Sequence, residues 1–360
     1  MTISESAWQA AVDALSAADE VALACHVDPD GDAIGSMLAL QRFLHTRGVR
    51  TTASWGMPEE DAGAELEVPP QYAFLPGLDT LVVPERFPEA PRLMVAFDTG
   101  APARLGSLRA AAEAAGTLIV IDHHSSGEAF GDIRLVDGSL AATAVLVDEL
   151  ITRMGGDLDR DTAVCLYTAL VTDTGRFQYA STTPRVLHLA ARLISLDIDH
   201  AAISQQVWST HSFGYLKLLS RALDRATLEP ESSLLWTAIT QEDLQRLGVA
   251  WQETEGLIEV LRSVGTARVA MIGKEQSDGA WKVSLRSRGE VDVGRIARDL
   301  GGGGHAFLAG MVVDGEIADV VGKVSALIPL HTHARLETEE RSDTRDARGD
   351  DAALSRRGTR

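Results

Sequence analysis

Short apolar runs alternate with longer amphipathic segments in the N-terminal half of the chain. The apolar runs at 21–25, 92–97 and 117–121 are typical of strands that are buried on both faces of a sheet. Apolar residues at helical spacing predict helices at 5–19, 34–48, 103–115, 140–154, 161–171 and 181–196. Strands and helices in this alternation predict a parallel sheet with helices on both faces.

The pattern changes near residue 210, where the predicted elements are those of a smaller, mixed domain. Strands are predicted at 234–239, 266–275 and 281–288, followed by a Gly-rich segment at 301–305 and a last element at 317–329. We therefore predict an α/β chain with two domains. The predicted divisions are a larger domain at 1–195, a linker at 196–215, a smaller mixed α/β domain at 216–330 and a tail at 331–360.

Acidic and histidine residues follow directly after the three predicted strands of the first domain. They lie in HVDPDGD (26–32), DTG (98–100) and DHH (122–124), and TDTGRF (172–177) follows a predicted helix. Ligands of open parallel sheets bind outside the carboxyl ends of the strands, so these loops should converge. Carboxylates with imidazoles, and no cysteine, suit a divalent ion such as Mn²⁺ or Mg²⁺. One ion would use three or four of these ligands, and two ions would use about six.

Charge and composition narrow the possible functions. The 360 residues include 33 Lys and Arg and 52 Asp and Glu, which gives a formal net charge of −19. A coat for long nucleic acid, duplex or single-stranded, is disfavoured because it needs a basic face. The tail at 331–360 holds seven acidic residues, seven arginines and almost no large apolar residue, so we predict that it is disordered.

Cysteine usage and hydropathy predict the compartment. Only Cys25 and Cys165 are present, both in apolar runs, which excludes a disulfide scaffold and indicates a reducing environment. No stretch reaches the roughly 18–20 apolar residues of a membrane span, and the acidic N-terminus is unlike a signal peptide. We therefore expect a cytoplasmic protein without a membrane partner.

Four N-terminal segments and one C-terminal segment resemble a known family. HVDPDGDAIGS, FDTG, DHH and TDTGRF are similar to motifs one to four of the DHH phosphoesterase superfamily. SLRSRGEVDVGRIARDLGGGGHAFLAG resembles its DHHA1 domain. Together they resemble the bifunctional oligoribonuclease and pAp phosphatase enzymes, over residues 1–330. The resemblance implies an N-terminal parallel-sheet DHH domain linked to a smaller mixed DHHA1 domain.

The resemblance also implies a site with two divalent metal ions, most often Mn²⁺. The implied metal ligands are His26, Asp30, Asp32, Asp98, His123 and Asp173. By motif position, Asp98 would bridge an ion held by His26 and Asp30 and an ion held by the other three ligands. Asp122 would orient a histidine, and His124 would donate to the phosphate or the leaving group. Asp28 is outside the family's ligand pattern, so we expect an N-cap or turn residue there.

The second domain carries candidate substrate-binding residues. Residues 262–298 hold eight Lys or Arg and four acidic residues, although the whole chain is acidic. Arg286, next to Ser287, can pair with phosphate or stack on a base. Glycines in GGGGH allow backbone N–H groups to approach a phosphate. By resemblance, Gly303, Gly304 and His305 would bind the terminal phosphate or sugar of a nucleotide.

The resemblance implies a hydrolase that converts short oligoribonucleotides to mononucleotides and pAp to AMP. The resemblance also suggests a homodimer. A cyclic di-AMP or pApA phosphodiesterase would use the same chemistry and stays open. A RecJ-type single-strand exonuclease is disfavoured because motif one begins with His26 and no OB-like domain is evident. A non-catalytic nucleotide-binding protein is disfavoured because every ligand position is filled.

Overall fold

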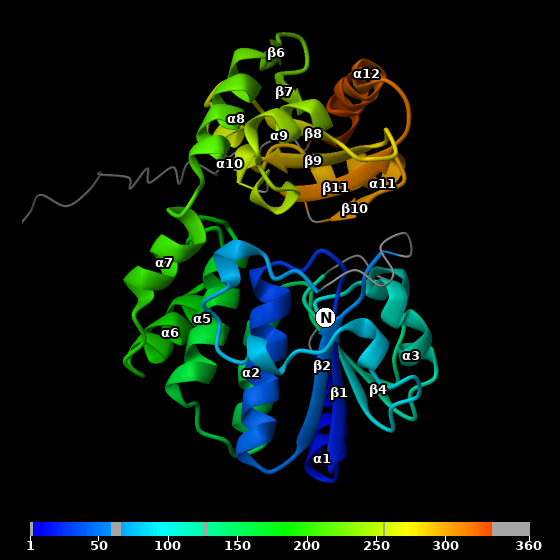
Figure 1. Ribbon diagram of the computed structural model, residues 1–360, viewed down its shortest axis with the longest axis vertical. Coiled ribbons are helices and arrows are strands. Elements are labelled where there is room, and N and C mark those ends of the chain that lie inside the picture. The colour runs from blue at the N-terminus through cyan, green and yellow to red at the C-terminus, as the bar shows by residue number, and fades with distance from the viewer. Residues whose placement is uncertain (1–2, 59–65, 125–128, 255, 305, 333–360) are drawn as a thin grey trace, which may run out of the picture.

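The computed structural model describes residues 3–58, 66–124, 129–254, 256–304 and 306–332. Within these ranges the chain forms two β-sheets, each with its own helices (Figure 1). Across the same residues, no helix is both long enough and apolar enough to pass through a membrane.

The first sheet is parallel throughout, as the sequence predicts. Its strand order is β2-β1-β3-β4-β5. The strands are β1 (Glu20–Cys25), β2 (Arg50–Trp55), β3 (Met94–Phe97), β4 (Leu118–Asp122) and β5 (Ile133–Val136). The predicted runs at 21–25, 92–97 and 117–121 correspond to β1, β3 and β4. β2 and β5 were not predicted because they form the two edges of the sheet, where less of the strand is buried.

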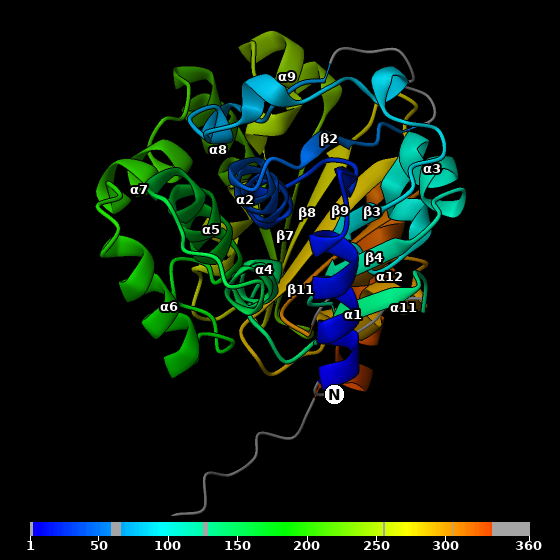
Figure 2. The same cartoon turned by 90° about the horizontal axis from the view of Figure 1, so that it is seen from below.

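Helices cover both faces of this sheet (Figure 2). The helices of this part are α1 (Glu5–Ser16), α2 (Gly31–Thr46), α3 (Arg109–Glu113), α4 (Thr143–Arg153), α5 (Arg160–Asp173), α6 (Pro184–Ile194) and α7 (His200–Trp208). Of these, α6 and α7 pack against α5, on its side away from the sheet. Alternate residues of β1 enter two different cores. Leu23 packs into the core that α2, α4 and α5 share, and Ala22 packs into the core beside α3.

One predicted helix is largely absent. Where a helix was predicted at 103–115, the structure has a 3₁₀ helix at Pro102–Leu108, and only α3 (Arg109–Glu113) is α-helical. Gly106 interrupts the segment with φ 52° and ψ −131°. A Cβ at Gly106 would lie 2.4 Å from the Met57 carbonyl oxygen, so this close backbone approach takes precedence over local helix propensity.

The second sheet is mixed, with the order β10-β11-β9-β8-β7-β6. Its strands are β6 (Thr227–Glu229), β7 (Leu234–Ile239), β8 (Val269–Glu275), β9 (Trp281–Ser287), β10 (Gly303–Gly304) and β11 (Leu308–Val313). β7 and β8 pair in parallel, and the other pairs are antiparallel. The helices of this part are α8 (Phe213–Asp224), α9 (Gln241–Leu247), α10 (Leu257–Arg262), α11 (Val293–Asp299) and α12 (Ile317–Leu327).

The segment at 196–215, predicted as a linker, contains α7 and the start of α8. Ile203 and Val207 of α7 are buried in the core of the first sheet, whereas Tyr215 of α8 is buried in a core of the second. The chain therefore passes from one core to the other between α7 and α8. Most of the predicted tail, residues 333–360, lies outside the described residues.

α2 and α5 approach each other through small residues. A Cβ at Gly31 would lie 2.6 Å from Thr172 Oγ1, and a Cβ at Gly35 would lie 2.5 Å from the Cys165 carbonyl oxygen. The backbones can therefore meet only where α2 has no side chain. This contact brings the start of α2 next to the end of α5, where two of the predicted metal ligands lie.

We predict that Gly35→Ala lowers the free energy of unfolding by about 1–3 kcal/mol, because the added methyl group overpacks the contact between α2 and α5. Urea denaturation measures the change. Gly322→Ala is the matched control, since nothing lies within 4 Å of a Cβ at this position of α12. There alanine should stabilise the helix by about 0.5–1 kcal/mol. Equal effects of the two substitutions would contradict the close packing.

Candidate metal centre and substrate cleft

The structure brings the six predicted metal ligands together at the carboxyl ends of the strands. His26 follows β1, Asp98 follows β3 and His123 follows β4. The remaining ligands come from the start of α2 and the last residue of α5. Groups whose ligand atoms all lie within 4.8 Å of one another are His26 with Asp30 and Asp98, Asp32 with His123 and Asp173, and Asp98 with His123 and His124. The first two groups match the two ligand sets that the motifs imply.

Asp32 is held by the N-terminus of α4, which the sequence analysis did not identify. Its Oδ2 accepts from the Thr143 backbone N–H at 2.6 Å, and its Oδ1 accepts from the Ala144 N–H at 3.0 Å and from Ser36 Oγ at 2.9 Å. The first N–H groups of a helix have no partner within the helix, so they suit a carboxylate. Asp32 is fully buried, so these bonds replace the water it has lost.

Asp98 occupies the middle of the ligand cluster in a left-handed conformation, with φ 53°. Non-glycine residues adopt this conformation at a cost that the surrounding structure must balance. Thr143 Oγ1 donates to Asp98 Oδ1 at 2.9 Å, and His123 Nε2 lies 3.4 Å from the same oxygen. His26 Nε2 lies 3.6 Å from Oδ2. Both carboxylate oxygens therefore face ligand-bearing side chains, as a bridging ligand requires.

The two histidine ligands are oriented by backbone carbonyl groups. His26 Nδ1 lies 2.7 Å from the Val27 oxygen, and His123 Nδ1 lies 3.3 Å from the Leu140 oxygen. For His123, an Nδ1–H that donates to the Leu140 carbonyl group leaves the lone pair of Nε2 available for a metal. Arg104 also lies beside His26 Nδ1, at 2.9 Å, and was missed because it is 78 positions away in the sequence.

The charges of the cluster fit a divalent cation. Burial, followed by the charges of neighbouring carboxylates such as Asp98, raises the pKa of Asp32 and of Asp173 well above their usual range. Burial also opposes ionisation of Asp98, but the hydrogen bond to His26 and the charges of His124 and His123 outweigh it and lower its pKa. Buried acids that repel one another are the donors that a divalent ion neutralises.

Asp122 lies in hydrogen-bond contact with His124, the kind of contact that its predicted orienting role requires. Asp122 Oδ1 lies 2.6 Å from His124 Nδ1 and accepts from the His124 backbone N–H at 3.2 Å. Burial opposes the protonated imidazole. The hydrogen bond to Asp122 and the charges of Asp98, Asp122 and Asp173 outweigh that effect and raise the pKa of His124 to about 10. His124 is therefore a cation in this arrangement.

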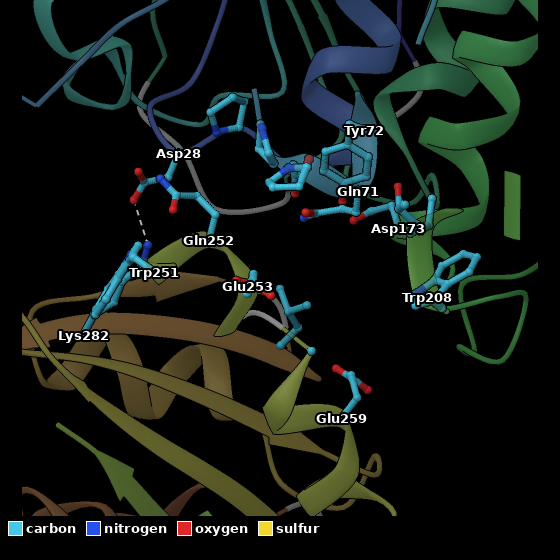
Figure 3. A pocket seen from close by; sticks show the side chains of 18 of the residues that line it. Asp28, Gln71, Tyr72, Asp173, Trp208, Trp251, Gln252, Glu253, Glu259 and Lys282 are labelled. Carbon is cyan, nitrogen blue, oxygen red and sulfur yellow. Dashed lines mark hydrogen bonds and ion pairs between the residues drawn. The ribbon is translucent and has the colours of Figure 1, made fainter. Parts of the chain in front are cut away.

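A cleft of about 1780 Å³ separates this centre from the second domain (Figure 3). His26, Asp30 and Asp173 line it from the first domain, and Arg286 lines it from the second. Among the described residues, two side-chain hydrogen bonds cross it: Lys282 Nζ donates to Asp28 Oδ2 at 2.7 Å, and Gln252 Nε2 donates to Glu67 Oε2 at 3.1 Å. Asp28 is thus a cross-domain partner, and the N-cap of α2 is Asp30.

The predicted substrate-binding residues of the second domain are not all placed alike. Arg286 points to the cleft, but the adjacent Ser287 is 1% exposed on the opposite face of β9, because side chains alternate along a strand. Gly303 and Gly304 form β10, on the side of the second domain that faces the first (Figure 1), but are absent from the described lining of the cleft. His305 lies outside the described residues.

We predict that Thr143→Val weakens divalent metal binding about 10–100-fold, because Asp98 loses the hydroxyl group that orients it. Calorimetric titration with Mn²⁺ measures the affinity. Thr152→Val is the control, because Thr152 is exposed on the same helix and donates to the Asp148 carbonyl group. Wild-type affinity in Thr143→Val would show that this hydroxyl group does not orient Asp98.

We also predict that the metal-free protein loses stability as the pH rises toward 10. The pKa of His124 is about 10 in the folded state, above the roughly 6.5 of an unfolded histidine. A histidine whose pKa is higher in the folded state stabilises the fold fully when the pH is below its pKa in the unfolded state. This stabilisation is lost as the pH rises through its pKa in the folded state. Urea denaturation in chelator at several pH values measures the effect. Asp122→Asn should flatten the profile, and an identical profile would contradict the prediction.

Comparison with known proteins agrees with this geometry. Residues 20–170 match the DHH family, N-terminal domain, and residues 239–328 match the DHHA1 domain. A Thermus thermophilus protein named bifunctional oligoribonuclease and PAP phosphatase NrnA is 35% identical over 295 residues, 81% of this chain and 84% of that protein. The Bacillus subtilis protein of the same name is 29% identical over 300 residues, 82% and 90% of the two chains.

A solved structure shows the same fold over nearly the whole chain. It is an exopolyphosphatase-related protein from Bacteroides fragilis, with a TM-score of 0.81 and 26% sequence identity. The match covers 91% of this chain and 98% of that one. The chain therefore belongs to the DHH family of phosphoesterases, with the family's N-terminal domain followed by a DHHA1 domain.

Proposed function

We propose that this phosphoesterase hydrolyses short oligoribonucleotides to mononucleotides and converts pAp to AMP. The observation that carries the proposal is the set of six ligands, in two groups that share one cleft with Arg286. The Thermus and Bacillus relatives, which align over most of their length, are named for both activities. The site therefore has the residues that a two-metal phosphoryl displacement requires.

We propose that His26, Asp30 and Asp98 hold one ion, and that Asp32, His123 and Asp173 hold the other, with Asp98 as the shared ligand. Oxygen and imidazole donors fit Mn²⁺. When bound, the two ions supply hydroxide at neutral pH and neutralise charge on the phosphate. Among the chain's own groups, Thr143 Oγ1 keeps the bridging carboxylate in place, and the N-terminus of α4 keeps Asp32 in place.

His124 is the proposed proton donor. Its Nδ1 is engaged by Asp122, so Nε2–H is the group that can donate to a phosphate oxygen or to the leaving oxygen. In the metal-free cluster, the hydrogen bond to Asp122 and the charges of Asp98 and Asp122 raise the pKa of His124, which favours the protonated imidazole. Asp122 contributes by keeping the ring oriented and positively charged.

The cleft supports a preference for short substrates. It is closed on one side by the contacts between Asp28 and Lys282 and between Glu67 and Gln252. A long strand would have to break these contacts, and it would also meet a chain with a net charge of −19. Two or a few nucleotides would not need to break these contacts, and they carry fewer negative charges than a long strand.

Assembly and location are further parts of the proposal. We propose a homodimer, on the strength of the sequence resemblance, and sedimentation of the purified protein measures it. We propose a cytoplasmic location because both cysteines, Cys25 and Cys165, are free and buried.

The direct test is hydrolysis by the Mn²⁺-loaded protein of pAp, pApA, cyclic di-AMP and RNA of two, five and 24 nucleotides. We expect pAp and the short RNAs to be hydrolysed fastest. Asp98→Ala should reduce each rate at least about 1000-fold, because losing the bridging ligand removes several kcal/mol of transition-state stabilisation. Asp137→Ala is the control, since Asp137 lies outside the ligand groups and bonds Ser139.

Each other outcome assigns a different function. Faster turnover of cyclic di-AMP or pApA would identify a cyclic dinucleotide pathway enzyme. Equal rates on the 24-mer and the dinucleotide would indicate an exonuclease for long strands. Tight nucleotide binding without turnover would indicate a non-catalytic nucleotide-binding protein.

A further inference from the structure

Two arginines on the second domain's side of the cleft share one carboxylate. Glu259 of α10 accepts from Arg286 Nε at 2.7 Å through Oε1 and from Arg262 at 3.3 Å through Oε2. The side chains of Arg286, Arg262 and Glu259 are 15%, 22% and 35% exposed. All three line the cleft, so this is a partly buried group rather than a surface ion pair.

The second arginine also contacts the first domain. The Arg262 guanidinium lies 4.7 Å from the centre of the Tyr179 ring, a cation–π distance. Tyr179 follows Asp173 on the same segment of the first domain. A Cβ on Gly175 would lie 2.4 Å from the Tyr179 ring, so this ring is held against backbone as well as by Arg262. Arg262 is therefore fixed from two directions, by Glu259 and by Tyr179.

Arg286, Arg262 and Glu259 together carry a charge that favours binding of an anion. Burial raises the pKa of Glu259, but the charge and hydrogen bond of Arg286, and then those of Arg262, outweigh burial and lower it. Glu259 is therefore ionised, and two guanidinium groups with one carboxylate carry a net positive charge. Guanidinium groups that are already oriented bind phosphate with less loss of side-chain entropy.

We propose that Glu259 is a positioning residue, which holds Arg286 and Arg262 as a paired subsite for the substrate phosphate that is not cleaved. Figure 3 shows Glu259 across the cleft from Asp173, so the cleaved phosphate would lie at the metal ligands and the second phosphate would lie here. The inference rests on the proposed function and makes the second phosphate a determinant of specificity.

Two substrates that differ only in the phosphate that is not cleaved measure how much this phosphate contributes to kcat/KM. Both pAp and adenosine 3′-monophosphate present a 3′-phosphate for hydrolysis, but only pAp carries a 5′-phosphate. The preference for pAp, taken as the ratio of the two kcat/KM values, measures what the second phosphate adds. We expect the Mn²⁺-loaded wild-type protein to prefer pAp.

Glu259→Gln should reduce this preference at least about tenfold, mainly through a higher KM for pAp, because Arg286 and Arg262 lose the carboxylate that orients them. Simple electrostatics predicts the opposite, since removing a negative charge from the cleft favours an anionic substrate. Glu253→Gln is the matched control. Glu253 lines the same cleft, and its Oε1 accepts from the Ala250 backbone N–H. Glu253→Gln should leave the preference for pAp at the wild-type value.

Arg262→Gln is the second variant, which keeps the pair of Glu259 and Arg286. It should also reduce the preference for pAp, and Glu259→Asp should recover part of the loss in Glu259→Gln. The proposal is overturned if Glu259→Gln lowers the KM for pAp or keeps the wild-type preference for pAp. If Glu259→Gln does not fold, the proposal is overturned when Arg262→Gln keeps the wild-type preference. A wild-type protein without any preference for pAp also overturns it and leaves the proposed function intact. In this experiment, failure to hydrolyse pAp is the result that would count against that function.

Discussion

The structure depends on the placement of mutually repelling carboxylates in a buried position. Asp32 and Asp98 are almost completely inaccessible, and Asp173 lies beside them. Such a cluster is unfavourable unless each charge has partners. Backbone N–H groups of α4 serve Asp32, and the Thr143 hydroxyl and the histidines serve Asp98. These partners hold the carboxylates in place but leave some carboxylate oxygens directed at one another. A divalent ion bound between those oxygens would neutralise their charge.

The packing of the first domain follows from the same requirement. Asp32 and Asp173 belong to different helices, and they lie close together because α2 packs against the Thr172 side chain at Gly31 and against the α5 backbone at Gly35. The parallel sheet adds the remaining ligands, since consecutive parallel strands end at the same edge. The glycines of α2 and the register of the strands thus place the ligands of the site next to one another.

The second domain adds basic side chains to the cleft, among them Lys282 and Arg286. Along β9, alternate side chains face the cleft, so Lys282 meets Asp28 while Arg286 meets Glu259. One strand therefore both ties the domains together and presents a guanidinium group toward the metal ligands. In a chain with a net charge of −19, these basic side chains of the cleft favour an anionic substrate there.

Much of this could be predicted from the sequence. Apolar runs followed by HVDPDGD, DTG and DHH indicated buried strands with ligands at their ends. A short continuous apolar run indicates a buried strand, and the polar residues that follow it mark the strand's carboxyl end. The strands β1, β3 and β4 and the mixed second sheet confirmed that prediction. The edge strands β2 and β5 were missed because exposure weakens the same pattern.

Only the tertiary structure decided which partners each ligand has. Thr143 and Ala144 are more than 100 positions from Asp32, and Arg104 is 78 positions from His26, so no local pattern connects them. The same holds for Ser287, which faces away from the cleft, and for Asp28, which pairs with Lys282 across it. The sequence by itself determined which residues could bind metal, because that depends on side-chain chemistry. The fold decided their orientation and their partners, because those depend on contacts between distant segments.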